Sequence, residues 1–230
     1  MTDKRFLTTR SSDGRFNSLE MPRMGCAGVR FGRNVPRKNA KQPTEEELMT
    51  PNPRLVSETF MKRTEADFKP ATTLNLLAAA WIQFQVHDWF FHPEQTKENF
   101  HVKLADGDDW PSKDGQMPVP KSVPDEMLDD SDKRCPGYIN TQTPWWDGSQ
   151  LYGINEEMTR EIRKGLPDGK LALDKEKTEA FLPRDGDTGL PLTGFNNNWW
   201  LGLEILHTLF ALEHNAVCEM FRQKHPEWTG

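Results

Sequence analysis

The chain has 230 residues, of which 29 are basic and 35 acidic, and its formal charge at pH 7 is −6. This length suits one domain with a substantial core, and no long block of one charge sign indicates a nucleic-acid groove or an anchor to an anionic membrane. Cys26, Cys135 and Cys218 are odd in number and lack CxxC spacing, so neither a disulfide framework nor a zinc knuckle is indicated and a reducing compartment is expected.

Residues 1–70 are predicted to form an extended, loop-rich N-terminal arm. The segment is rich in Gly, Pro, Arg and Asn, and only residues 54–63 could hold a short helix. It opens with "MTDKRFLTTR", which contains no apolar run. No signal peptide is therefore predicted, and the expected location is cytoplasmic.

Residues 72–91 predict the first long helix. Apolar residues recur through "TTLNLLAAAWIQFQVHDWFF", the Thr pair at its start can cap a helix, and Pro93 follows its end. Although this is the most apolar part of the chain, it carries four polar residues in its second half, Gln83, Gln85, His87 and Asp88. The interruption argues against a membrane span, and the polar residues need another explanation.

The remaining chain predicts helices joined by loops. Residues 95–142 have the composition of an acidic, Pro-rich loop, and residues 155–166 that of a short polar surface helix. Residues 197–225 predict a second long helix, because their apolar residues fall at helical intervals. Without a strong hairpin signal or an internal repeat, we expect a mainly α fold with long irregular loops and little or no β structure. Its helical domain is expected to span residues 71–230.

The spacing of polar residues on the first helix indicates two separate sites. Residues four apart share a helix face, so Gln83 and His87 project together. Asp88 lies about 100° further round the helix and therefore serves a different site. The alternative is a structural role, because a histidine and a glutamine on a buried helix often satisfy only backbone carbonyls and each other.

Zinc is not predicted at the histidines. On a helix, His87 and His92 would lie about 140° apart around the axis. His207 and His214 are two helical turns apart, which is too far for one tetrahedral ion. The helix geometry therefore excludes the simplest zinc pairs.

The segment "TPWWDGSQLYG", residues 143–153, offers oxygen ligands at every second residue. In an extended segment these groups would face one way, and calcium prefers such hard oxygen ligands. If Asp88 completed the set, the ion would clamp this segment to the first helix behind His87. The alternative is an Asp147-Gly148 turn flanked by buried tryptophans.

Taken together, these motifs resemble the animal-type haem peroxidase superfamily, which also contains cyclooxygenases and fatty-acid α-dioxygenases. The resemblance is greatest to the α-dioxygenase-like and bacterial members. It extends over nearly the whole chain, through "TTRSSDGRFN", "MGCAGVRFGRNV", "LNLLAAAWIQFQVHDW", "TPWWDGSQLYG", "LFALEHNAVC" and "HPEW". Because several motifs occur in the family's order, the resemblance is specific to the family, while the branch is less certain.

The resemblance implies a role for each candidate residue. His87 would be the distal catalytic histidine over a haem, and Gln83 its helical neighbour in the distal, cofactor-binding pocket. Calcium would be bound by Asp88, Thr143, Trp145 through its carbonyl, Asp147 and Ser149. The polar residues of the first helix would then serve a haem on one side and an ion on the other.

Two departures from the family pattern change the expected chemistry. Peroxidases of this family usually bring an arginine into the distal pocket from the segment before "REHN", but here that segment is "FNNNWW" and Leu212 replaces the basic residue of the motif itself. A cation there helps to stabilise charge as a peroxide bond splits, so its absence favours oxygenase over peroxidase chemistry. Val86, Trp199 and Trp200 stand where mammalian members carry ester tethers, so noncovalent haem b is expected.

The resemblance further implies that the chain is the N-terminal half of a catalytic domain. The proximal histidine, the radical-forming tyrosine and the residues that bind a fatty-acid carboxylate would all follow the equivalent of Gly230. The predicted helix at 197–225 is apolar around most of its circumference, so it needs more neighbours than the remaining chain supplies. The missing C-terminal half is therefore an expected partner.

The expected function is a haem-dependent oxidoreductase of the peroxidase or fatty-acid dioxygenase type. Its substrates would be a hydroperoxide or O2 together with a fatty-acid-like molecule, and no nucleic acid or membrane span is expected. Two alternatives stay open: a plain peroxidase, and a truncated, catalytically silent chain that keeps the calcium loop as a structural or interaction piece.

Overall fold

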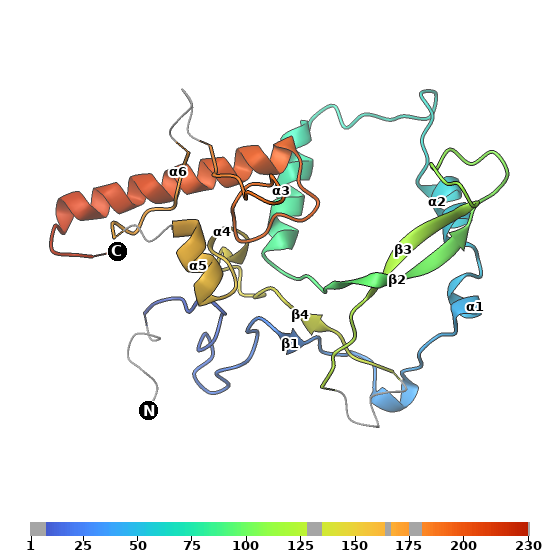
Figure 1. The fold of residues 1–230 in the computed structure, drawn as a ribbon, viewed down its shortest axis with the longest axis horizontal. Helices are drawn as coiled ribbons and strands as arrows, with labels where there is room; N and C mark the ends of the chain where they lie inside the picture. Colours follow the sequence, from blue (N-terminus) through green and yellow to red (C-terminus); the bar gives the residue numbers. More distant parts are fainter. Residues whose placement is uncertain (1–7, 128–134, 164–166, 175–180, 230) are drawn as a thin grey trace. The chain divides into compact units, whose positions relative to one another are not determined.

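The computed structural model describes residues 8–127, 135–163, 167–174 and 181–229, and Figure 1 shows its helices and strands. The chain divides into two compact units. The core unit contains residues 1–29, 72–91 and 140–230, and the hairpin unit contains residues 30–71 and 92–139. The short strands β1 (Val29–Arg30) and β4 (Ile139–Asn140) lie where the chain passes from one unit to the other.

Two helices predicted from the sequence form the centre of the core unit. They are α3 (Leu76–His87) and α6 (Leu201–Lys224), which pack across each other (Figure 1). The Asn75 side chain caps α3 by accepting a hydrogen bond from the Leu77 amide, so the cap is Asn75 and not the Thr pair before it. Small and large apolar side chains alternate at the crossing, where the buried cluster consists of Ala80, Phe84, Leu151, Leu203 and Leu206.

Two shorter helices complete the core unit, α4 (Ser149–Tyr152) and α5 (Glu156–Arg163). The helix predicted at 155–166 is α5, and residues 164–166 lie outside the described residues. The loop that follows is held to α6 because the Asn215 amide both accepts from the Leu171 N–H and donates to the Leu171 carbonyl. This pairing satisfies both the N–H and the carbonyl of Leu171. It also fixes the loop against the second apolar cluster, which consists of Ile162, Leu171, Leu182 and Ala211.

The hairpin unit corrects the expectation of little or no β structure. Strand β2 (Glu94–Lys103) pairs antiparallel with β3 (Gln116–Ser122), and Phe100 stands opposite Val119. Both strands lie in the segment predicted to be loop. Polar residues dominate β2, and Pro118 and Pro120 in β3 argue against a strand by composition, although proline is compatible with a strand that has one free edge.

Short helices accompany the hairpin in this unit: η2 (Arg37–Asn39), α1 (Glu45–Leu48) and α2 (Pro53–Phe60). The last is the helix expected at 54–63, and it begins where the Asn52 side chain accepts from two backbone amides and Pro53 occupies the first turn. The Arg54 guanidinium binds Asp108 at 2.7 Å and 2.9 Å, which joins α2 to the turn between the strands.

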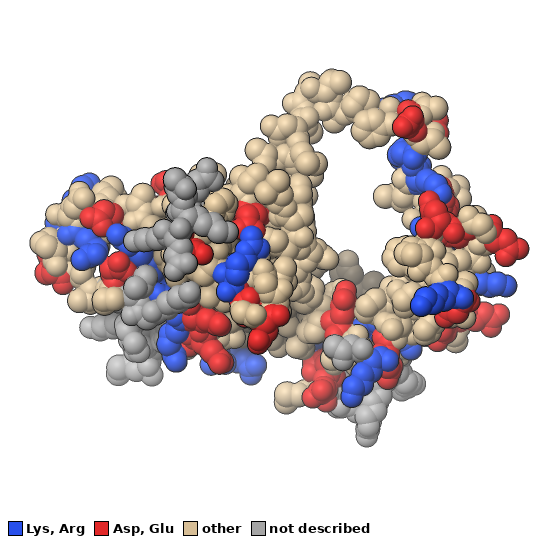
Figure 2. Space-filling view, turned by 45° about the horizontal axis from the view of Figure 1, so that its top comes forward, with Lys and Arg blue, Asp and Glu red and all other residues tan. Residues whose placement is uncertain are grey.

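Both long helices of the core unit carry exposed apolar faces. On α6, Leu201, Ile205 and Leu209 recur one turn apart with exposed fractions of 71%, 45% and 56%. On α3, Trp81 and Ile82 are also exposed. Among the described residues, no helix is long and apolar enough to cross a bilayer. Figure 2 shows acidic and basic side chains intermixed within each unit on the face in view.

Candidate functional site

His87 is the last residue of α3 and is nearly buried, with 6% of its surface exposed. Its ring packs at a tilt against Phe195, with 4.4 Å between ring centroids. The Nδ1 atom is buried and has no hydrogen-bond partner among the described residues. Burial lowers the pKa of His87 to about 4, so the imidazole is neutral at pH 7 and can accept a proton.

Gln83 lies one turn before His87, as the spacing predicts, but its amide is engaged within the chain. Its Nε2 donates to the Asn198 carbonyl at 3.1 Å, and its Oε1 accepts from the Trp200 indole at 2.7 Å. Asn198 adopts a left-handed backbone conformation with φ of 52°. Gln83 thereby fixes the segment before α6, which is the segment where relatives were expected to supply an arginine.

A second buried histidine, His207 on α6, belongs to the same region. It is fully buried and packs against Phe84 and Trp199, with ring centroids 4.9 Å and 4.8 Å away. The Thr193 hydroxyl donates to the Gln150 carbonyl and lies 2.9 Å from His207 Nδ1, so Nδ1 carries the hydrogen and Nε2 keeps its lone pair. Burial, and to a smaller degree the nearby His87, lowers the pKa of His207 to about 3.

Acidification is expected to destabilise the core unit through His207. Its folded pKa of about 3 lies below the ordinary 6.5, so its stabilising contribution is complete above pH 6.5 and is lost as the pH falls toward 3. Between pH 7 and pH 5, His207 should lower the free energy of unfolding by about 2 kcal/mol. Urea unfolding at the two pH values, compared between the unmodified chain and a His207 variant, measures this change, because buried His87 contributes to the pH dependence of both.

Two variants make this measurement specific to His207. His207→Gln should remove about 2 kcal/mol of the pH dependence, whereas His92→Gln, at an exposed histidine, should leave it unchanged. An undiminished pH dependence in His207→Gln would contradict the assignment.

Asp88 immediately follows α3 and faces away from the His87 neighbours, toward the start of α4. Its Oδ1 accepts from the Ser149 amide at 2.7 Å and from the Ser149 hydroxyl at 3.0 Å, and its Oδ2 accepts from the Gly148 amide at 3.1 Å. Burial raises the pKa of Asp88 in spite of these bonds, and the charge of Asp147 raises it further. The two carboxylates therefore lie close enough to repel each other.

Residues 143–148 form turns and are not extended, so the expected alternation of ligands along a strand is wrong. Trp146 and Gly148 have φ of 54° and 79°, and α4 begins at Ser149. The chain instead brings the groups together by folding back, because the Thr143 hydroxyl donates to Asp147 Oδ1. The Trp145 indole donates to the Met24 carbonyl at 3.1 Å.

The expected calcium ligands thus meet as two hydrogen-bonded pairs, Asp88 with Ser149 and Thr143 with Asp147. Among the described residues, no cluster of three or more His, Cys, Asp or Glu could hold a metal ion. The expected set contains two carboxylates, and its hydroxyl and carbonyl oxygens are the other ligand types that calcium accepts. Asp147 Oδ2 is buried without a hydrogen bond to any residue that the structure describes, and it lies 3.0 Å from Arg10 Nε. The donor set fits a hard cation, with Arg10 beside it.

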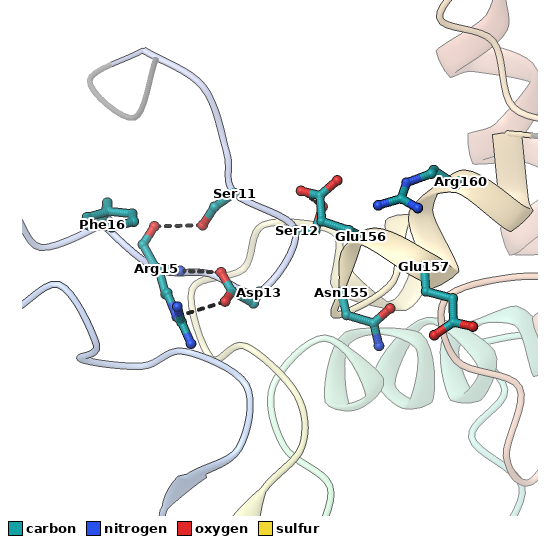
Figure 3. A pocket seen from close by; sticks show the side chains of 9 residues that line it. All are labelled: Ser11, Ser12, Asp13, Arg15, Phe16, Asn155, Glu156, Glu157 and Arg160. Carbon is teal, nitrogen blue, oxygen red and sulfur yellow. Dashed lines mark hydrogen bonds and ion pairs between the residues drawn. The ribbon is translucent and has the colours of Figure 1, made fainter. Parts of the chain in front are cut away.

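Two cavities lie in the core unit, and one of them is close to the buried histidines. A cavity of about 680 Å³ separates the N-terminal arm from α5, and Figure 3 shows its charged side chains, with Arg15 paired to Asp13. A second cavity of about 420 Å³ is lined by Phe91, Gln142, Thr193 and Phe195 among others. Phe195 also packs against His87 and Thr193 bonds His207, so this second cavity borders the histidine region.

Sequence reasoning missed Arg10 and His207 as members of this region. Arg10 lies 137 positions before Asp147 in the sequence, so no local pattern could pair them. His207 carried a signal that was available, a histidine within the apolar run "EILHTLF", which is the same signal that singled out His87.

Comparisons with known proteins identify curated relatives of the chain. The chain is 35% identical over 220 residues to alpha-dioxygenase PIOX of Oryza sativa subsp. japonica, covering 94% of this chain and 33% of that protein. It is 34% identical to alpha-dioxygenase 2 of Arabidopsis thaliana, covering 95% of this chain and 32% of the relative. The chain therefore spans about a third of the length of the curated relatives it matches.

Comparison of the fold with solved structures gives a consistent result. The crystal structure of Oryza sativa fatty acid alpha-dioxygenase matches with a TM-score of 0.80 and 33% identity, over 99% of this chain and 35% of that one. Peroxidase A from Dictyostelium discoideum shares the fold with a TM-score of 0.69 at 23% identity, over 95% of this chain and 47% of that one. The model of the animal haem peroxidase family matches residues 9–230, which is nearly the whole chain. By sequence and by fold, the chain belongs to the animal haem peroxidase family.

Proposed function

We propose that this chain forms the distal, haem-facing part of an oxidoreductase of the fatty-acid dioxygenase type. The observation that carries the proposal is His87: a buried, neutral imidazole whose Nδ1 has no hydrogen-bond partner in the part of the chain that the structure describes, in a chain whose relatives include alpha-dioxygenases. A polar atom buried without a partner is uncommon in a native protein and suits a residue kept for a ligand.

His87 would act as a general base and then as a general acid. Its neutral ring would accept a proton from the O–H group of a hydroperoxide. It would then give this proton to the oxygen that leaves when the O–O bond breaks. Gln83 has a positioning role in this proposal, because its bonds to Asn198 and Trp200 hold the wall of the pocket beside α3. Bound haem would supply the oxidation chemistry.

The haem would be held without a covalent tether. Val86 stands beside His87, and the indoles of Trp199 and Trp200 donate hydrogen bonds to Glu204 and Gln83. None of these three side chains carries the carboxylate that an ester to haem requires. Noncovalent haem b is therefore the proposed cofactor, and extraction into acidified organic solvent should release it unmodified.

A calcium ion is proposed beside the haem region, at Asp88, Thr143, the Trp145 carbonyl, Asp147 and Ser149. Two neighbouring carboxylates and two hydroxyls support this assignment. Because Asp88 follows His87 directly, an ion bound there would also fix the end of α3 and the direction of the imidazole. The ion would thus couple the loop to the catalytic residue.

The exposed apolar faces of α3 and α6 are proposed to pack against polypeptide that corresponds to the uncovered two thirds of the relatives. Leu201, Ile205 and Leu209 would be buried in that contact. The proposed substrate is a fatty acid, as in the relative whose crystal structure was determined with palmitic acid. Both statements concern the whole protein of which this chain would be a part.

Reconstitution tests the proposed function. The chain is co-expressed with the segment that corresponds to the uncovered part of the Oryza sativa relative, loaded with haem, and mixed with palmitic acid. We expect a haem absorption band and oxygen uptake that depends on the fatty acid. Guaiacol oxidation by peroxide at about 10 per second or faster, without fatty-acid-dependent uptake, would instead identify a plain peroxidase.

A further inference from the structure

The first part of the N-terminal arm, residues 8–28, is anchored to α5 within the core unit on the C-terminal side of Arg10. Its turn is closed by a hydrogen bond from the Ser11 hydroxyl to the Arg15 carbonyl and by the ion pair of Arg15 with Asp13 (Figure 3). Ser12 Oγ lies 3.2 Å from Glu156 Oε1 and accepts from Thr159 on α5. The position of Arg10 is therefore set by the fold.

The same arm covers the loop of residues 143–149. A Cβ atom added at Gly14 would lie 2.7 Å from Thr143 Cγ2, and one at Gly25 would lie 2.5 Å from Trp145 Nε1. Both glycines also have positive φ, 74° and 66°. Only glycine at positions 14 and 25 allows the arm to approach the loop this closely. The arm therefore packs directly over the loop.

The arm places the guanidinium of Arg10 next to Asp147 in the loop. Arg10 Nε lies 3.0 Å from Asp147 Oδ2, and the guanidinium also donates to the Gly153 carbonyl at 2.9 Å and to the Ser12 carbonyl at 3.2 Å. The side chains of Arg10 and Asp147 are 22% and 12% exposed. The pair is shielded from solvent, so its charges act on the loop with little screening.

We propose that Arg10 is a resident cation of the 143–149 loop, which lowers the affinity of the loop for a divalent cation and keeps the loop folded without one. This inference rests on the calcium site proposed above. Arg10 offsets one of the two carboxylate charges and takes the Asp147 oxygen that an ion would need. A calcium ion must therefore displace or share this contact, and it binds against the repulsion of the guanidinium.

Cation titration of the 230-residue chain tests the proposal. Calcium binding is measured by calorimetry, and terbium binding by luminescence excited through Trp145 and Trp146, which precede Asp147. Arg10→Gln should bind both cations at least about tenfold more tightly than the unmodified chain, because a unit positive charge a few ångströms from the site is removed. The cation-free variant should also melt at a lower temperature and recover when calcium is added.

Three further variants separate charge from folding. Arg10→Lys keeps the charge, so its affinity should stay within about threefold of the unmodified chain. Arg15→Gln removes another arm arginine that is paired to a carboxylate, Asp13, and should not change the affinity. Asp147→Asn should abolish tight binding. Circular dichroism of each cation-free variant checks that the helices are retained.

The failures of the two proposals are distinguishable. Equal or weaker binding by Arg10→Gln, with Asp147→Asn still abolishing it, would overturn the role of Arg10 and leave the calcium site standing. Cation binding that is absent from all variants, or that persists unchanged in Asp147→Asn, would overturn the calcium site and the inference with it.

Discussion

Replacing His87 by alanine is expected to lower fatty-acid-dependent oxygen uptake of the reconstituted, haem-loaded protein by about 100- to 10,000-fold, the usual contribution of a positioned general acid or base. The reason is the state of the side chain. Its pKa near 4 keeps the ring unprotonated at pH 7, and its free Nδ1 is not committed to any described neighbour. Oxygen-electrode rates at saturating palmitic acid measure the loss.

His92→Ala is the matched control for this experiment. His92 lies five residues further along the chain, is exposed, and its Nδ1 lies 3.0 Å from the Ser122 hydroxyl, so its removal should leave the rate unchanged. The absorption spectrum of each variant shows whether haem is still bound. A His87→Ala protein with a normal haem spectrum and undiminished oxygen uptake would end the assignment of His87 as the catalytic residue.

The second large effect is on stability. Asp88→Ala should lower the free energy of unfolding by about 3 kcal/mol, because it leaves two backbone amides, one buried and one part-buried, without their acceptor. These donors are the Gly148 amide and the Ser149 amide, whereas the Ser149 hydroxyl can still donate to Gln142 Oε1, 3.2 Å away. The burial that raises the pKa of Asp88 partly offsets this loss, since an ionised carboxylate is costly to bury. Urea unfolding at pH 7 gives the difference.

Asp185→Ala is the control that tests this explanation. Asp185 also accepts three hydrogen bonds, from the Thr188 amide and hydroxyl and from the Asp187 amide, but its turn is exposed. Water can replace those bonds, so the cost there should be about 1 kcal/mol. Asp88→Asn keeps one acceptor oxygen and should lie between the two. Equal costs at Asp88 and Asp185 would mean that burial does not set the energy of the Asp88 contacts.

Local pattern was sufficient for the long helices and for the different directions of the His87 and Asp88 side chains. Apolar periodicity predicted 72–91 and 197–225, where α3 and α6 are found, because a helix that packs on one face must repeat its apolar residues every three to four positions. The same period placed His87 and Asp88 on different sides of one helix. The structure gives them different neighbours, Phe195 for His87 and the start of α4 for Asp88.

The hairpin of β2 and β3 was not predictable in the same way. Its strands are polar and one contains two prolines, so their composition resembles a loop. Strand pairing decides such a case, because Phe100 lies opposite Val119 only after the two segments on either side of the turn have met. Single-sequence patterns do not record that meeting.

By itself, the sequence determined the family motifs, the two long helices and the candidate residues His87, Gln83 and Asp88. Only the tertiary structure decided what those residues contact: Gln83 is held by Asn198 and Trp200, and Asp147 by Arg10. The physical reason is the separation in sequence over which each kind of interaction acts. Helical periodicity is set by neighbours within a few residues, whereas a hydrogen bond or ion pair between segments depends on how the whole unit packs.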